Sequence, residues 1–129
     1  MFFYGTLMTG FERRKRLGMD DRLRARGRAT IQGKLFDLGL YPAAVPSSDG
    51  RVHGEVFEVD DPEPVLRALD ELEGYEPGSP DTSLYVRRSV RATLEGGTEL
   101  EAWAYFYNAP LGQAPAISSG DYLAYLKRH

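Results

Sequence analysis

The chain has 129 residues, of which 42% are hydrophobic and 27% are charged, so it can bury a core and we expect one domain spanning residues 1–129. A net charge of −3 gives no reason to expect a nucleic acid or an anionic membrane as partner, and no apolar run reaches the roughly 18 residues that span a bilayer. Because cysteine is absent, disulfides, thiol nucleophiles and thiolate metal sites are excluded.

The N-terminal residues predict a short strand that ends at a glycine turn. Met1–Tyr4 is apolar and aromatic, and Gly5 and Thr6 follow it. A buried strand that meets such a turn leaves main-chain N–H groups facing open space, where they can hold an anion. No basic region precedes the strand as in a secretory leader, so we expect a cytoplasmic protein. The basic run Arg13–Arg16, within residues 8–18, is interpreted as the solvated face of a short helix.

The next segments predict extended chain on both sides of a proline-rich loop. Residues 24–38 are expected to be extended, and residues 39–48 form the loop. Tyr41 in this loop is a candidate for lining a pocket, although its pattern favours packing beneath the loop. Val52–Val59 is rich in strand-forming residues, and Gly54 inside it indicates a bulge or the close approach of another backbone.

A helix is predicted next, and one carboxylate on it stands out. Asp61 and Pro62 are typical of a helix start, and Gly74 of a helix end. At 100° per residue, four apolar residues share one arc: Val65, Leu66, Leu69 and Leu72. Glu73 falls within this arc, whereas Asp70 lies at its rim. Burial and the helix dipole should raise the pKa of Glu73, as a general acid or base near neutrality requires; the alternative is a solvated Glu whose stem covers apolar surface.

The second half predicts a β-hairpin with two covered faces. Tyr85–Leu94 alternates, Gly96-Gly97 is a permissive turn, and Leu100–Tyr107 returns. Aromatic residues gather on one face of the return strand, namely Trp103, Tyr105 and Tyr107. Since both faces are apolar or aromatic, we expect a closed or half-closed barrel with a helix packed across it. A short helix over residues 122–127 is expected after Asp121.

The sequence lacks the motifs that several kinds of enzyme chemistry require. No G-x-S-x-G motif, glycine-rich phosphate loop or metal-ligand spacing occurs. A pair of carboxylates formed by Glu73 with Asp70 or Glu76 is conceivable. What remains is one half-buried carboxylate and a turn of backbone donors, which suits proton transfer on a small anionic substrate.

Six short motifs, taken in order, resemble those of a known family. They are Y-G-T-L (residues 4–7), G-K-L-F-D-L-G-L-Y-P-A (33–43), V-H-G-E-V-F-E-V (52–59), L-D-E-L-E-G-Y (69–75), Y-V-R (85–87) and I-S-S-G-D-Y (117–122). With them the chain resembles the γ-glutamylcyclotransferase-like proteins over nearly its whole length. The resemblance implies an α+β fold, a small mixed or antiparallel β-barrel with flanking helices, whose Lys34–Leu38 segment joins the other predicted strands in one curved sheet.

The resemblance also implies a reaction and its residues. Family members cyclise a γ-glutamyl amine or peptide to 5-oxoproline and release the amine, without a cofactor or metal. Glu73 matches the family's acid/base, and the backbone of Tyr4, Gly5, Thr6 and Leu7 matches the cradle for the glutamyl group; Tyr41 and Tyr105 are further candidates for substrate binding. The alternatives are a module of the same fold that binds a small metabolite without turnover, and an interaction domain that uses the Trp103-Tyr105-Tyr107 face.

Overall fold

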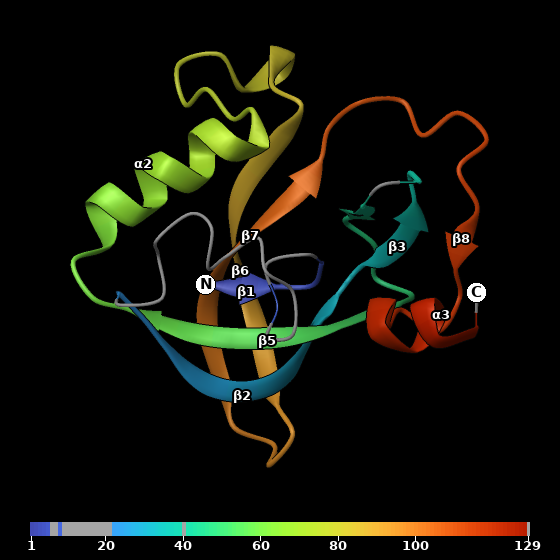
Figure 1. The fold of residues 1–129 in the computed structure, drawn as a ribbon, viewed down its shortest axis with the longest axis horizontal. Helices are drawn as coiled ribbons and strands as arrows, with labels where there is room; N and C mark the ends of the chain where they lie inside the picture. Colours follow the sequence, from blue (N-terminus) through green and yellow to red (C-terminus); the bar gives the residue numbers. More distant parts are fainter. Residues whose placement is uncertain (6–7, 9–21, 40, 129) are drawn as a thin grey trace.

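The computed structural model describes residues 1–5, 8, 22–39 and 41–128 and has an α+β fold, as predicted (Figure 1). Its strands form two antiparallel sheets. The larger sheet has the order β1 (Phe2–Phe3), β5 (Arg51–Val59), β2 (Leu23–Gln32), β6 (Tyr85–Leu94) and β7 (Glu99–Tyr107). The smaller sheet has the order β4 (Pro42–Val45), β3 (Lys34–Asp37) and β8 (Ala116–Ile117). The helix α2 (Pro62–Glu73) and the helix α3 (Tyr122–Arg128) lie toward opposite ends of the molecule (Figure 1).

The prediction of one curved sheet was wrong for residues 34–38. Strand β3 follows β2 after the single residue Gly33 but pairs with β4 and β8 instead. A Cβ atom at Gly33 would lie 3.0 Å from the Val45 carbonyl oxygen, a tight contact that a glycine avoids where the chain passes between the sheets. The smaller sheet also uses β4, which lies in the segment expected to be a loop, and β8, for which no strand was predicted. Both are short and lack an alternating pattern, so only their pairing with β3 defines them.

The larger sheet is strongly curved but not closed. Its edge strands β1 and β7 come into contact, yet they are not hydrogen-bonded neighbours. A side-chain hydrogen bond, from the Tyr4 hydroxyl to the Tyr105 carbonyl oxygen, links the two edges at 2.6 Å. The term barrel therefore describes the fold only loosely.

The close approach predicted at Gly54 is confirmed. Strand β1 lies antiparallel to β5, with Phe3 opposite Glu55, and a Cβ atom at Gly54 would collide with the carbonyl oxygen of Phe3. The missing side chain thus lets β1 lie against β5.

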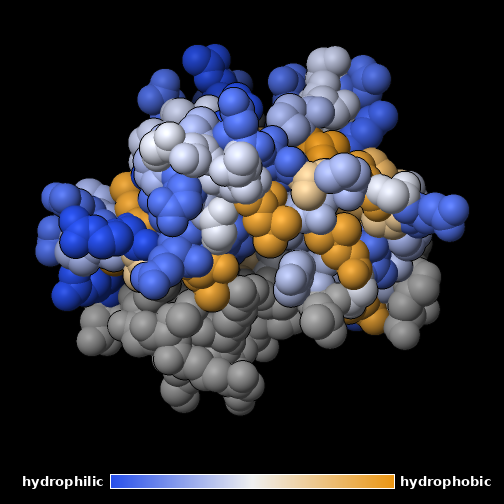
Figure 2. All heavy atoms as spheres, turned by 90° about the horizontal axis from the view of Figure 1, so that it is seen from above, coloured by the Kyte–Doolittle hydropathy of each residue, from blue (hydrophilic) through white to orange (hydrophobic). Residues whose placement is uncertain are grey.

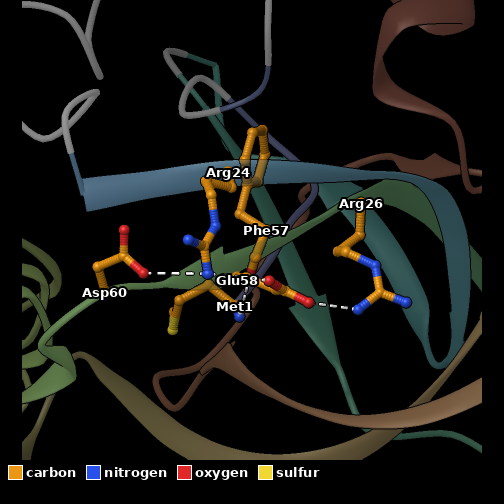
Figure 3. A network of polar contacts seen from close by, with 6 residues as sticks. All are labelled: Met1, Arg24, Arg26, Phe57, Glu58 and Asp60. Carbon is orange, nitrogen blue, oxygen red and sulfur yellow. Dashed lines mark hydrogen bonds and ion pairs between the residues drawn. The ribbon is translucent and has the colours of Figure 1, made fainter.

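A polar network holds β1, β2 and β5 together at their outer side (Figure 3). The Met1 nitrogen donates to the Phe57 carbonyl oxygen at 2.8 Å, and the Phe57 N–H donates back to Met1 at the same distance. Glu58 accepts hydrogen bonds from Arg24 and Arg26, and the bond from Arg26 is the largest cause of the lowered pKa of Glu58. Because these charged groups are exposed, the ion pairs contribute little stability, and the backbone bonds position β1.

Helix α2 begins and ends where the sequence predicts. Gly74 follows its last residue with φ 68°, and its N–H donates to the Glu71 carbonyl oxygen. Asp61 occupies the N-cap position but makes no capping hydrogen bond, so the expected role of its side chain was wrong. Its carboxylate lies 3.6 Å from Arg22 instead. At the start of α3, the expected cap is confirmed, because Asp121 accepts a hydrogen bond from the Ala124 N–H at 3.2 Å.

One core runs through both sheets and α2. Large fully buried side chains in this core include Phe2, Ile31, Leu35, Val52 and Leu69, from β1, β2, β3, β5 and α2. None of the helices within the described residues is long and apolar enough to cross a membrane. The helix expected over residues 8–18, with its run of basic residues, lies outside the described residues except for Met8.

Candidate active site

A cavity of about 80 Å³ opens where the end of β1 meets the C-terminus of α2. Five sequence-predicted site residues line it: Tyr4, Gly5, Tyr41, Glu73 and Tyr105. The other lining residues are mostly apolar or aromatic, namely Phe2, Phe3, Pro42, Leu72, Leu84 and Tyr85. Residues from distant parts of the chain thus meet here. Thr6 and Leu7, the remaining two predicted residues, lie outside the described part of the chain.

Glu73 is the carboxylate that faces this cavity. It is the last residue of α2, is half-buried, and lies beside Leu72 in the cavity wall. Its negative charge helps to raise the pKa of both the Tyr4 and the Tyr105 hydroxyl, although burial is the larger cause at each. This mutual influence indicates that the three groups share one electrostatic environment. The expected rise in the pKa of Glu73 itself stays a prediction.

Tyr4 forms a fixed wall of the cavity. Its side chain is buried, and its hydroxyl donates to the Tyr105 carbonyl oxygen and accepts from the Ala44 N–H at 3.3 Å. Burial is the main reason why the pKa of Tyr4 lies well above its ordinary value, followed by the charges of Tyr85 and Glu73. The hydroxyl therefore stays protonated at physiological pH and positions β1 against β4 and β7.

Asp70 was expected at the rim of the helix but is buried, with 8% of its surface exposed. Its Oδ1 accepts hydrogen bonds from Arg87 Nε at 2.8 Å and the Tyr105 hydroxyl at 2.5 Å, and its Oδ2 accepts one from Arg87 Nη2 at 3.2 Å. Such a bidentate pair is strong and directional. The prediction failed because the charged partner, Arg87, comes from strand β6 and is invisible to a helical pattern.

The Arg87 guanidinium is held from several sides. It lies 4.6 Å from the centre of the Trp103 ring and 5.8 Å from that of Tyr75, within cation–π range. Because it holds Asp70, and Asp70 holds the Tyr105 hydroxyl, the wall beneath the cavity is pre-organised. The sequence did not reveal Arg87 as a site residue, and Asp70 was considered only as a possible carboxylate partner of Glu73; their presence in the short L-D-E-L-E-G-Y and Y-V-R motifs was the available signal.

Tyr41 lies at the mouth of the cavity and is 37% exposed, so it lines the opening instead of packing beneath the loop. Its part in substrate binding stays a prediction. Within the residues that the structure describes, no three histidine or acidic side chains gather as a metal site requires. The cavity combines one carboxylate, protonated tyrosines and an apolar floor, an arrangement able to move a proton within a small bound molecule.

Fold and cavity together define a small α+β protein with a carboxylate-lined cavity at the C-terminus of its main helix. Residues 1–124 match the family model described as "Gamma-glutamyl cyclotransferase, AIG2-like". The chain belongs to this family.

Relatives and solved structures agree with this assignment. A protein of Methanocaldococcus jannaschii, whose name provisionally assigns γ-glutamylcyclotransferase activity, is 32% identical over 97% of this chain and 96% of its own. The γ-glutamylaminecyclotransferase of Bos taurus is 37% identical over 74% of this chain and 57% of its own. The crystal structure of an AIG2-like protein from Mus musculus superposes with a TM-score of 0.71 and 26% identity, covering 94% of this chain and 86% of the other.

Proposed function

We propose that this protein cyclises γ-glutamyl amines or γ-glutamyl peptides to 5-oxoproline and releases the amine. The observation that carries the proposal is the position of Glu73 in the wall of the cavity that Tyr4 and Gly5 also line. Family membership supports the reaction class, and the name of the bovine relative supports an amine as leaving group. A cavity of about 80 Å³ suits a small group, since larger ligands occupy pockets of roughly 300 Å³ or more.

In the proposed reaction Glu73 acts first as a base and then as an acid. Its carboxylate takes a proton from the α-ammonium group of the substrate, and the freed amine attacks the γ-carbonyl carbon to form the new C–N bond. The carboxylic acid then protonates the leaving nitrogen as the old C–N bond breaks, and the regenerated carboxylate takes the second proton from the new ring nitrogen, which leaves a neutral amide. This second proton passes to the released amine, which departs as an ammonium ion, so no proton is gained or lost overall and one residue suffices.

The remaining residues bind and orient the substrate. Main-chain N–H groups from Gly5 through Leu7 are proposed to hold the glutamyl group and to offset the negative charge that develops on the γ-carbonyl oxygen. Because the attack is intramolecular, holding the substrate in a folded conformation supplies much of the rate. Tyr105, held by Asp70, is proposed to give this conformation a rigid wall.

Glu73→Gln tests the proposal. The amide keeps size and polarity but cannot accept the proton, so 5-oxoproline formation from γ-glutamyl amines should fall by about 10²–10⁴-fold. Substrate affinity should persist, because the amide still fills the site. The unfolding free energy should stay level or rise slightly, because a half-buried carboxylate is costly to desolvate.

Glu71→Gln is the matched control, since Glu71 is exposed in the same last turn of α2. It should retain the parent rate. Unchanged turnover in Glu73→Gln would overturn the mechanism, and loss of activity through unfolding would make Glu73 a structural residue. Binding of γ-glutamyl compounds by the parent protein without any 5-oxoproline would instead indicate a binding module.

A further inference from the structure

A second hollow of about 280 Å³ adjoins the cavity that holds Glu73. Leu38, Tyr41, Leu84 and Tyr107 line it. Tyr41 and Leu84 also line the first cavity, so the two spaces share a boundary. We propose that this hollow is the subsite for the leaving group and that it selects amines with an apolar, uncharged chain. The inference rests on the proposed function and adds a substrate class to it.

Leu84 lies between the two spaces and is held in place by its backbone. Its N–H donates to the Gly74 carbonyl oxygen at 3.1 Å, and its carbonyl oxygen accepts from the Asn108 N–H at 2.8 Å. Gly74 directly follows Glu73 in the chain. The bond between Leu84 and Gly74 therefore places the apolar side chain of Leu84, which is 44% exposed, close in space to Glu73, the residue proposed to protonate the leaving nitrogen.

The other walls of the hollow are fixed as well. Tyr107 packs edge-on against Tyr85, with ring centres 5.2 Å apart and an interplanar angle of 67°. The Leu38 N–H donates to the Tyr41 carbonyl oxygen at 3.1 Å, which closes the turn between these two wall residues. Because these walls are already ordered, binding a ligand costs little conformational entropy. Differences in the chemistry of the leaving group should therefore appear directly as differences in affinity.

The charge of the hollow argues for an uncharged occupant. None of its four described wall residues carries a formal charge. The carboxylate next to it in sequence, on Asp37, is already engaged by the Gly39 N–H at 2.7 Å and the Tyr125 hydroxyl at 2.6 Å. An ammonium group placed there would lose water without gaining an ionic partner from these walls, whereas a methyl group would not. Figure 2 shows that hydrophobic residues do reach the surface on the face seen from above, within hydrophilic surroundings.

A matched pair of substrates tests the subsite. γ-Glutamyl-n-hexylamide and γ-glutamyl-5-aminopentylamide have equally long chains that end in a methyl group or an ammonium group. We expect kcat/KM for 5-oxoproline formation to be at least about tenfold higher for the hexylamide, because the ammonium group stays unpaired. Leu84→Glu should reverse this order by supplying an ionic partner. Leu126→Glu, at a leucine of similar exposure (42%) that lines neither space, should leave both rates and their ratio unchanged.

Affinity is measured separately, with Glu73→Gln and both amides by isothermal titration calorimetry. A tighter dissociation constant for the hexylamide, by about tenfold, supports the subsite even if the parent protein forms no 5-oxoproline; that combination would overturn the proposed function alone. Equal dissociation constants for the two amides, or an unchanged order in a folded Leu84→Glu protein, would overturn the subsite alone.

Discussion

Asp70 and Glu73 lie one turn apart on α2 but differ in their surroundings. Asp70 is saturated by Arg87 and the Tyr105 hydroxyl, whereas Glu73 faces the cavity. Asp70 thus supports the wall of the cavity, and Glu73 is the carboxylate for which we propose proton exchange.

Asp70→Ala should lower the free energy of unfolding by about 3 kcal/mol or more, because it leaves the half-buried Arg87 without its ionic partner. Urea denaturation of the purified variant measures this change. Glu63→Ala removes the carboxylate of an exposed ion pair with Arg67 on the same helix and should change stability by less than about 0.5 kcal/mol. Equal changes in the free energy of unfolding for the two substitutions would show that the buried ion pair between Asp70 and Arg87 does not stabilise the protein more than the exposed pair does.

At the scale of elements, β1 depends on a missing side chain in its neighbour. Strand β1 carries Phe2 and Phe3 into the core and ends beside Tyr4 and Gly5 in the cavity wall. Its place against β5 is available only because Gly54 has no Cβ atom. A substitution of Gly54 in β5 should therefore displace β1 and alter the cavity wall, although Gly54 itself does not line the cavity.

Gly54→Ala should destabilise the protein by about 1–3 kcal/mol, the usual cost of overpacking, and should weaken the affinity for γ-glutamyl substrates. Thermal unfolding and a substrate titration measure the two effects. Gly78→Ala is the control, because Gly78 has open space around its Cβ position and should tolerate the change. A folded Gly54→Ala protein with parent stability would show that β1 can shift without cost.

At the scale of the whole molecule, two sheets share one core. Buried residues of the larger sheet, such as Ile31, and of the smaller sheet, such as Leu35 and Ile117, belong to the same cluster. Between β2 of the larger sheet and β3 of the smaller sheet, Gly33 is the single connecting residue. We therefore infer that neither sheet has a core that it could keep alone.

Residues 1–129 should accordingly unfold as one cooperative unit. Differential scanning calorimetry should show a single transition whose calorimetric and van't Hoff enthalpies agree, as for small single domains. Tryptophan fluorescence, which reports on Trp103 in β7, should give the same midpoint as far-UV circular dichroism. Separate transitions, or midpoints that differ between the two probes, would indicate that the smaller sheet unfolds independently.

Local patterns were enough to predict the elements whose interactions lie close in sequence. Helix α2, its end at Gly74, the β6–β7 hairpin and the position of Glu73 on a core-facing arc all follow from periodicity and turn chemistry. The strands β4 and β8 did not follow: β4 is short and begins at a proline within a loop-like segment, and β8 has only two residues and pairs with β3, which lies far from it in sequence.

Tertiary structure alone decided which side chains meet. The pairing of Asp70 with Arg87 joins residues 17 positions apart, and the bond from Tyr4 to Tyr105 spans 101 positions. Neither contact can be predicted from the periodicity of a helix or strand. Periodicity indicates on which face of its own element a residue lies, but not which residues of other elements lie opposite that face. The sequence by itself thus determined that Glu73 sits on a buried face, and the packing of β1, β6 and β7 against α2 determined that this face is the wall of a cavity.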